Sequence, residues 1–325
     1  MENSQNSNAS IPSDMPCALK TFDEEANTIV DGWLSELKRC PVPEHIYHYT
    51  ADIGLRGILE SGKLWLTDVF SLNDPSEVQH GVSIAMDLFD KQTNGKNDEC
   101  QELARDFRGG LQGKSLKKIA HFFVCSFSAC KDDLGQWRAY ADNGRGYALG
   151  FDTTSIKDQF RRPLPENRDA FPVTYDDCDL TEIHRRIIEK VCPHALLPCY
   201  EKLSQRAINT YRAELLGKLA THVVHASLYF KHKAYSNEQE YRFLEVHSAD
   251  TQPDVQYRSR PYSLIKYREF DWKCAGPRVL KKIIIGPAAL HENHKKTRKF
   301  AEDCLDKCGI KDVDIVDSDI PYRRT

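Results

Sequence analysis

The pattern of apolar and polar positions predicts a chain in which helices and strands alternate irregularly. Helical spacing of apolar residues runs from Phe22 to Leu37, and again through most of Thr181–Lys231, with breaks expected around Pro193 and Pro198. Short apolar runs bounded by turn residues predict strands at 46–49, 64–66, 120–128, 146–151, 240–246, 282–287 and 313–316. Because no regular β-α-β repeat is present, we expect an α+β fold with a mixed, largely antiparallel sheet.

Turn and capping residues refine this prediction. Thr50 precedes a helical stretch of about 51–60, and Asp74, Pro75 and Glu77 have the form of a capping box for a helix that runs to about 89. Asp132 is the expected N-cap of a short helix that carries Trp137 and Tyr140. We expect residues 1–20 to be disordered, and residues 21–325 to form a single domain with a helical insert at about 179–232.

Composition limits the possible environments and partners. The chain of 325 residues has a net charge of -3, which gives no global support for a nucleic-acid or anionic-membrane partner. It has 11 cysteines and no C-x-x-C pair, so we expect reduced thiols and no metal site. No apolar run approaches the roughly 20 residues needed to span a bilayer, and no signal peptide is recognisable. We therefore expect a cytoplasmic protein that does not bind membranes.

The segment Glu238–Arg242 is the strongest candidate for chemistry. On a strand, residues two apart share a face, so Glu238, Glu240 and Arg242 would point the same way. Two carboxylates and a guanidinium are costly to bury unless they serve a purpose. The alternative is a solvated edge strand with a local ion pair.

Other polar clusters lie at the edges of apolar runs. His48 is at the end of a short strand, where it could orient a sugar hydroxyl or simply bond to a backbone carbonyl. Ser126 and Ser128 share one strand face, and no neighbouring base activates them as nucleophiles. Asn73 is not explained by helix capping and could contact a ligand. Trp137 and Tyr140, three apart on a helix, suit an aromatic wall or the core; these alternatives stay open.

In their order along the chain, these clusters resemble a bacterial family of unknown function. That family shows Tyr-His-Tyr-Thr, Leu-Trp-Leu-Thr-Asp, Leu-Asn-Asp-Pro-x-Glu, Trp-x-x-Tyr-x-x-x-x-x-Gly, Glu-x-Glu-Tyr-Arg, Ile-Ile-Ile-Gly-Pro and Ile-Pro-Tyr-Arg motifs. Here the motifs are residues 47–50, 64–68, 72–77, 137–146, 238–242, 283–287 and 320–323. The resemblance covers about residues 44–323.

The opening His-Tyr-Thr, the Gly-Leu-x-x-Ile-Leu-x-x-Gly helix and the Leu-Trp-Leu strand also resemble the ADP-ribosyltransferase superfamily. This resemblance implies an ADP-ribosyltransferase-like fold and NAD as substrate. It makes Glu240 the catalytic glutamate, Glu238 the acid that orients an acceptor, and His48 a contact to a ribose hydroxyl. The expected NAD contacts are Tyr49, Thr50, Trp65, Asn73, Ser126, Ser128, Trp137, Tyr140 and Arg242, with Tyr140 as the candidate to stack on nicotinamide.

The expected function is therefore transfer of ADP-ribose from NAD to a macromolecular acceptor, protein or nucleic acid, or hydrolysis of NAD. Such an activity would suit toxin or antiphage defence. A second hypothesis is a binding module that reads a nucleotide or ADP-ribose without turnover. A third is a metal-dependent nuclease that uses Asp68, Asp74, Glu77 and Glu238. The acceptor, the oligomeric state and the choice between Glu238 and Glu240 as the catalytic acid do not follow from the sequence.

Overall fold

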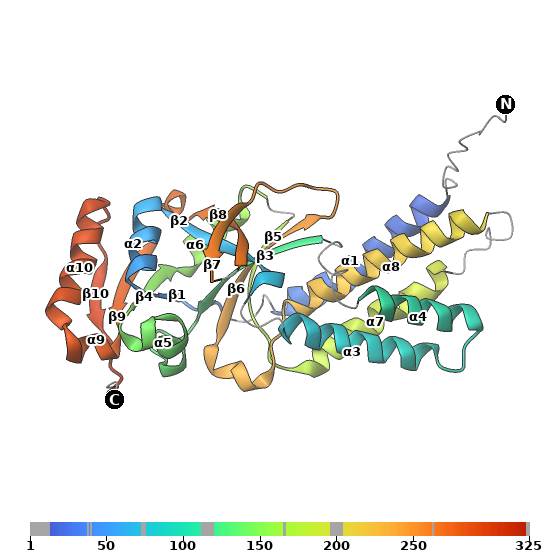
Figure 1. Ribbon diagram of the computed structural model, residues 1–325, viewed down its shortest axis with the longest axis horizontal. Helices are drawn as coiled ribbons and strands as arrows, with labels where there is room; N and C mark the ends of the chain where they lie inside the picture. The colour runs from blue at the N-terminus through green and yellow to red at the C-terminus, as the bar shows by residue number, and fades with distance from the viewer. Residues whose placement is uncertain are drawn as a thin grey trace, which may run out of the picture. The chain divides into compact units, whose positions relative to one another are not determined.

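Figure 1 shows the computed structural model, which describes residues 14–37, 39, 41–72, 76–111, 120–164, 167–195, 204–261 and 263–322. The chain divides into two compact units. The helical unit contains residues 1–36, 76–120 and 176–230, and the sheet unit contains residues 37–75, 121–175 and 231–325. The helical part of the molecule thus extends beyond the insert at about 179–232 and also takes in earlier segments of the chain.

The helical unit packs amphipathic helices around shared apolar faces. Its described helices are α1 (Asp14–Leu37), α3 (Ser76–Thr93), α4 (Asp98–Gly110), α7 (Asp177–Ala195) and α8 (Gln205–Ser227). Helix α3 packs on α4, α7 and α8, and α7 packs on α8. In α1, Phe22 lies edge-on between the rings of His194 and His222, which ties this helix to α7 and α8. None of the described helices is both long and apolar enough to cross a membrane.

The sheet unit is built on an open mixed sheet, so the prediction of an α+β fold is confirmed. The described strands are β1 (His45–Thr50), β2 (Lys63–Asp68), β3 (Ala120–Ser128), β4 (Tyr147–Asp152), β5 (Arg168–Pro172), β6 (Glu240–Ser248), β7 (Gln256–Arg260), β8 (Ser263–Asp271), β9 (Leu280–Ile285) and β10 (Asp314–Asp317). Their order is β10-β9-β4-β1-β3-β2-β8-β7, and β6 pairs with both β3 and β5. The pair β9–β10 is parallel, whereas β1–β4, β2–β8, β4–β9, β5–β6 and β7–β8 are antiparallel.

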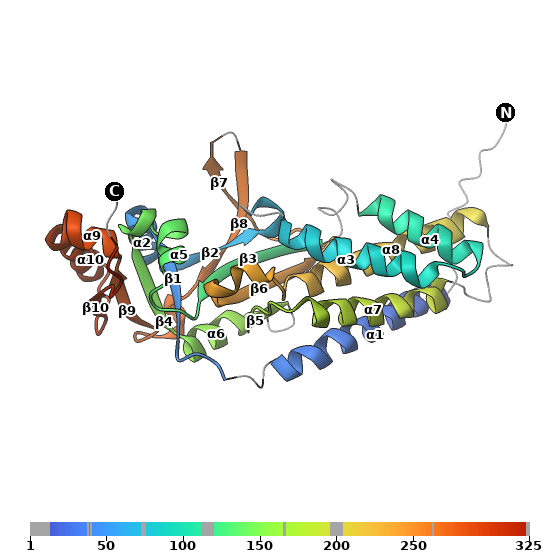
Figure 2. The same ribbon diagram turned by 90° about the horizontal axis from the view of Figure 1, so that it is seen from below.

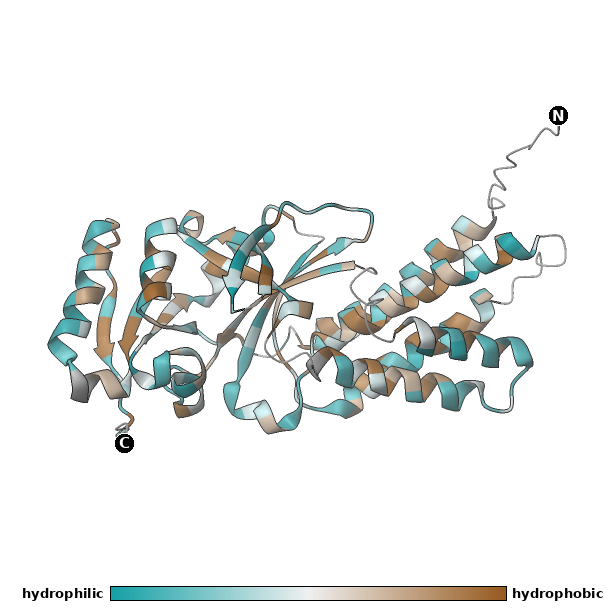
Figure 3. Ribbon diagram, in the orientation of Figure 1, coloured by the Kyte–Doolittle hydropathy of each residue, from teal (hydrophilic) through white to brown (hydrophobic). Residues whose placement is uncertain are grey.

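Short helices complete the sheet unit: α2 (Asp52–Ser61), α5 (Leu134–Tyr140), α6 (Thr153–Arg161), α9 (Pro287–Glu292) and α10 (His294–Lys307). One face of the sheet buries a large apolar cluster that includes Phe123, Phe127, Tyr241 and Phe243. Figure 3 shows the hydrophobic colouring running along strands such as β9. Since side chains alternate along a strand, the even-numbered residues Ser126, Ser128, Glu240 and Arg242 project to the opposite face.

Strand β3 is the junction of the sheet. It pairs with β1 through Tyr47 and Ser128, and with β2 through Thr67 and Val124. It also pairs with β6. Strands β1 and β6 therefore approach β3 near its end at Ser128, which brings residues distant in sequence to one place.

Several predicted boundaries and caps differ from the structure. Helix α1 begins at Asp14, before the expected start at Phe22 and within the segment expected to be disordered; residues 1–13 lie outside the described residues. Ala51, not Thr50, is the N-cap residue of α2, and no side chain caps it. Asp133 caps α5 because its carboxylate accepts from the main-chain N–H of Gln136.

The prolines have a smaller effect on the helices than expected. Pro193 lies inside α7, which continues to Ala195, although the sequence predicts a break there. A proline near the end of a helix removes few main-chain hydrogen bonds, so the last turn can persist. The predicted break at Pro198 and the capping residues Asp74 and Pro75 lie outside the described residues.

Candidate functional site

Glu240 is placed by the turn that leads into β6. The preceding residue, Gln239, has a left-handed backbone with φ of 43°, and its carbonyl accepts from the main-chain N–H of Ala129 at 2.8 Å. This bond joins the start of β6 to the end of β3. The turn brings Glu238 and Glu240 to the same neighbourhood, although Glu238 precedes the strand.

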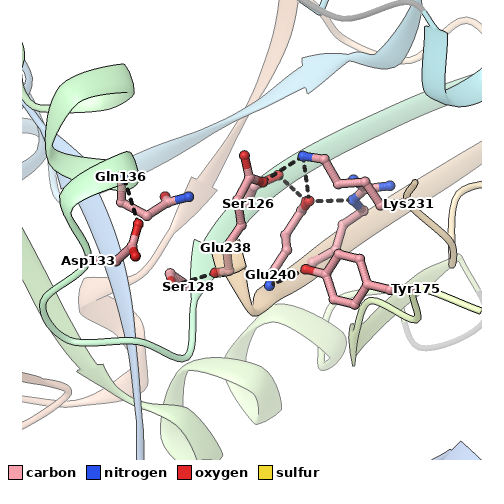
Figure 4. Close-up of polar contacts among 9 residues, drawn as sticks. Ser126, Ser128, Asp133, Gln136, Tyr175, Lys231, Glu238 and Glu240 are labelled. Carbon is pink, nitrogen blue, oxygen red and sulfur yellow. Dashed lines mark hydrogen bonds and ion pairs between the residues drawn. The ribbon is translucent and has the colours of Figure 1, made fainter. Parts of the chain in front are cut away.

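The carboxylate of Glu240 is the centre of a polar network (Figure 4). Its Oε1 accepts from the Ser126 hydroxyl at 2.7 Å and from the Arg242 Nε at 2.8 Å, and its Oε2 accepts from the Lys231 ammonium at 3.3 Å. Glu240 is 4% exposed, whereas Ser126 is exposed. The network thus reaches solvent through a serine hydroxyl that sits on a buried anion.

Lys231 joins the two glutamates. Its ammonium donates to Glu238 at 2.6 Å as well as to Glu240, and it lies over the ring of Tyr235. The side chain of Glu238 is 20% exposed, so this carboxylate is the more accessible of the two. A buried carboxylate and an open one therefore share one cation.

The electrostatic balance keeps Glu240 ionised. Burial alone would raise the pKa of its carboxyl, but the charges of Arg242 and Lys231 and the hydrogen bonds from Arg242 and Ser126 lower it to about 2. A carboxylate with so low a pKa is a poor general base at neutral pH, because it has little affinity for a proton. It is suited to stabilising positive charge nearby.

His48 approaches the main chain of Ser126 from the opposite face of the sheet. Its ring meets that of Phe127, a member of the large apolar cluster, so His48 does not share the face of Glu240. Strands β1 and β3 pair at Tyr47 and Ser128, and beyond this pair the His48 Nδ1 lies 3.2 Å from the main-chain oxygen of Ser126. A carbonyl only accepts, so Nδ1 carries the hydrogen. Burial lowers the pKa of His48, which favours the neutral ring. Its Nε2 is then an acceptor, and no described residue bonds to it.

Ser128 and Tyr175 fix the main chain around Glu240. The Ser128 hydroxyl donates to the carbonyl of Glu238 at 2.6 Å. The main-chain N–H of Glu240 donates to the Tyr175 hydroxyl at 2.8 Å, and burial raises the pKa of this tyrosine to about 12. Tyr175 therefore stays a neutral phenol that accepts from the start of β6.

Tyr49 and Trp137 belong to the scaffold beside the site. Their rings meet edge to face at 4.8 Å, and both are buried. The Tyr49 hydroxyl donates to the Cys130 carbonyl at 2.9 Å, and the Trp137 indole donates to Asp132 at 2.5 Å. These bonds use the polar atoms that a ligand contact would need.

The remaining predicted contacts are spread more widely. Tyr140 is exposed at the end of α5, a helix that packs on the segment 233–238. Thr50 ends β1 and packs closely on Gly54, where an added Cβ would meet its hydroxyl at 1.9 Å. Trp65 lies on β2 among residues of β7 and β8. Asn73 lies outside the described residues.

Glu245 forms a second buried network further along β6, on the opposite face of the strand. Its carboxylate accepts from Arg168 Nε at 2.6 Å and from the His247 Nε2 at 2.5 Å, and it also pairs with Arg268. Glu245 has no exposed surface, and the charge of Arg168 and the bond from His247 outweigh burial and lower its pKa. This network lies on the face of the large apolar cluster.

Sequence reasoning brought together Ser126, Glu238, Glu240 and Arg242 but missed Lys231 and Tyr175. Lys231 follows the apolar run Leu228–Phe230, and the sequence predicts it as the end of a helix. A lysine at the end of such a buried run is the signal that could have indicated it, since buried lysines are paired with anions. Nothing in the sequence around Tyr175 indicates its partner.

The described residues contain no group of three or more His, Cys, Asp or Glu side chains placed to hold a metal ion. Of the residues in the nuclease hypothesis, Asp68 caps a short turn by accepting from the Phe70 N–H, and Glu238 pairs with Lys231. Asp74 and the side chain of Glu77 lie outside the described residues.

Comparison with known families finds one partial match. Residues 136–243 match the model of a family described as a protein of unknown function, DUF2971. The matched stretch runs from α5 into β6 and contains Tyr175, Lys231, Glu238 and Glu240. His48 and Ser126 precede it. Among curated proteins and among solved structures, none matches the chain significantly.

Proposed function

We propose that the site around Glu240 cleaves the bond between nicotinamide and ribose in NAD and passes ADP-ribose to a macromolecular acceptor or to water. The observation that carries this proposal is the role of Ser126. Its hydroxyl bonds to Glu240, and its carbonyl bonds to His48. One residue thereby links the two side chains to which the resemblance to ADP-ribosyltransferases gives the main roles.

The chemistry needs an anion near the ribose. When the bond between C1′ and the nicotinamide nitrogen breaks, nicotinamide leaves neutral with the electron pair, and positive charge develops on the sugar. A carboxylate that stays ionised stabilises this charge without a proton transfer. Glu240, with a pKa of about 2, has that property.

His48 supports Ser126 from the opposite face of the sheet. Its neutral ring donates from Nδ1 to the Ser126 carbonyl, which helps to hold in place the serine that donates to Glu240. The acceptor group then attacks C1′ and loses a proton. Glu238, more exposed and bound to Lys231, is placed to orient that acceptor or to take the proton.

A second candidate is a nucleotide-binding module without turnover. The observation that favours it is that both carboxylate oxygens of Glu240 already accept hydrogen bonds. Oε1 accepts from Ser126 and Arg242, and Oε2 accepts from Lys231. The Lys231 bond, at 3.3 Å, is the longest of these and the easiest to exchange for a substrate hydroxyl. In the binding module this exchange would not lead to cleavage.

The test is incubation of the purified chain with NAD labelled on the adenylate, with and without cell lysate. Glu240→Gln should lower nicotinamide release at least about a hundredfold, the range for loss of one electrostatic contact to a transition state. Glu245→Gln is the matched control, because it neutralises a buried carboxylate of the same strand on the opposite face. Its release rate per folded molecule should stay unchanged.

The position of the label names the acceptor class. NAD binding without release would favour the binding module. If neither binding nor release occurs, or if Glu240→Gln releases nicotinamide as fast as the unaltered chain, the proposed role of Glu240 is wrong.

A further inference from the structure

The hairpin of β7 and β8 carries aromatic side chains outside the apolar core. It extends from the edge of the sheet next to β2, as Figure 2 shows. Trp65 on β2 is 43% exposed, although tryptophan is among the residues that gain most from burial. Its ring stacks at a tilt on Tyr267 of β8, with 4.4 Å between the ring centroids.

The strand register explains why these rings meet. Thr67 pairs with Tyr267, and Trp65 pairs with Glu269, so Trp65 and Tyr267 are diagonal neighbours on one face. On β7, Gln256 pairs with Tyr267 and Arg258 with Ile265, which places Arg258 on this face as well. The result is a cluster of two rings and a guanidinium on one face of three neighbouring strands, with Trp65 in contact with both Tyr267 and Arg258.

Arg258 brings a charge that the described residues do not neutralise. Its guanidinium carbon lies 5.4 Å from the centre of the Trp65 ring, and its Nη2 donates to the Thr67 hydroxyl at 3.5 Å. Its Nε has no partner, and no described carboxylate pairs with Arg258 or Arg260. Partial burial and the neighbouring charge of Arg260 lower the pKa of Arg258, so an added anion would be stabilising.

The hairpin is positive in a chain that is negative overall. Between residues 256 and 271 it carries Arg258, Arg260, Lys266 and Arg268 against Glu269 and Asp271, whereas the whole chain has a net charge of -3. Clustered cations attract phosphates, and exposed aromatic rings beside them offer a stacking surface for unpaired bases. A protein partner would use the rings but would not need the unpaired cations.

We propose that the surface formed by Trp65, Tyr267, Arg258 and Arg260 binds single-stranded nucleic acid. A base stacks on the exposed part of Trp65, which Tyr267 supports from the side, and the backbone phosphates on either side pair with Arg258 and Arg260. Binding here does not depend on NAD cleavage, so this proposal and the proposed function can fail separately. If both hold, the acceptor of ADP-ribose is a nucleic acid.

The strand face connects this surface with the site. Thr67 pairs with Val124, so Thr67, Val124 and Ser126 project from the same face of the sheet. Trp65 is also on this face, two residues before Thr67. A strand of nucleic acid bound at Trp65 could therefore follow one sheet face toward the hydroxyl of Ser126.

The experiment measures fluorescence anisotropy of labelled oligo(U) and oligo(dT) of about 16 nucleotides with the full chain. Trp65→Ala should weaken binding at least about fivefold, the lower range for loss of one stacking contact. Arg258→Gln and Arg260→Gln should each reduce the slope of log affinity against log salt by about 0.7. A duplex of the same length should bind more weakly, because its bases are already stacked.

Tyr257→Ala is the matched control. Tyr257 is 55% exposed on the same hairpin, but it pairs with Lys266 and so lies on the other face. It should bind the oligonucleotides as tightly as the unaltered chain. Thermal melting checks that each variant is folded.

Three outcomes would overturn the proposal: no binding of either oligonucleotide, equal losses in Trp65→Ala and Tyr257→Ala, or affinity that does not change in folded Trp65→Ala. Binding that an excess of NAD abolishes in the unaltered chain would also contradict it, because the surface would then be part of the NAD site.

Discussion

Strand β6 carries two buried glutamates whose surroundings differ in one respect. Both Glu240 and Glu245 are ionised and held by arginine, and charge and hydrogen bonding lower the pKa of each against the effect of burial. Glu245 is enclosed by Arg168, Arg268 and His247 on the face of the apolar core. Glu240 instead bonds to the exposed Ser126 and to a lysine that it shares with a second carboxylate.

This difference separates a structural ion cluster from a candidate for chemistry. Burial and a shifted pKa are common to both glutamates, so neither property alone indicates function. What distinguishes Glu240 is access through the exposed Ser126, whose hydroxyl donates to it, and a lysine shared with a more accessible carboxylate. The following predictions use Glu245 and Glu240 as a pair.

The largest expected effect is the loss of stability in Glu245→Gln. This change leaves the two arginines and His247 around a neutral amide, and removal of one partner from a buried ion pair typically costs about 3–5 kcal/mol. The free energy of unfolding in urea measures it. Glu269→Gln on β8, whose carboxylate pairs with the exposed Lys63, should leave the stability unchanged. Equal stability of Glu245→Gln and the unaltered chain would show that the enclosed network is not structural.

The second-largest effect should be the loss of unfolding free energy when the pH is lowered. The pKa of Glu240 falls from 4.5 to about 2 on folding, so its contribution is full above pH 4.5 and is lost as the pH falls through 2. At about 1.36 kcal/mol per pH unit, this amounts to roughly 3 kcal/mol. Unfolding of the unaltered chain and Glu240→Gln across this range should therefore show a difference that shrinks toward acid. A difference that stays constant with pH would contradict the low pKa.

The smallest effect concerns Lys231. In Lys231→Met the glutamates lose their shared cation, so the pKa of Glu240 should rise and the acid loss of stability should begin at higher pH. The loss at neutral pH should be about 1.5–3 kcal/mol, the range for hydrogen bonds to charged groups. Lys231→Arg keeps the charge and serves as the control. If Lys231→Met and the unaltered chain lose stability over the same acid pH range, Lys231 does not lower the pKa of Glu240.

The sequence predicted individual strands and helices better than it predicted how the strands pair. Apolar periodicity located β3, β6 and α8 because each buries a regular face, and the alternation along Glu238–Arg242 indicated which side chains would gather. The hairpin of β7 and β8 was missed since its residues are mostly polar or exposed: Gln256, Tyr257 and Arg258 have no buried face of their own.

Local sequence patterns could not predict which residues surround Glu240. Ser126 could be paired with Glu240 only once β6 was known to lie next to β3, and no periodicity encodes that pairing. The sequence predicts Lys231 as a helix end, whereas α8 ends at Ser227 and Lys231 lies beyond it. His48 was chosen for its residue type, whereas its tautomer follows from the Ser126 carbonyl that only the structure supplies.

Tyr175 and Lys231 stand at the two points where the chain leaves and re-enters the sheet unit around residues 176–230. The Lys231 N–H donates to the Thr174 carbonyl at 2.9 Å, so this long excursion is already closed at its base. Because its two ends are joined by this hydrogen bond, the segment can be treated as an insertion that is removable in one piece. A short turn joining Tyr175 to Lys231 would keep both residues beside the glutamates, and it would test which properties of the sheet unit depend on residues 176–230.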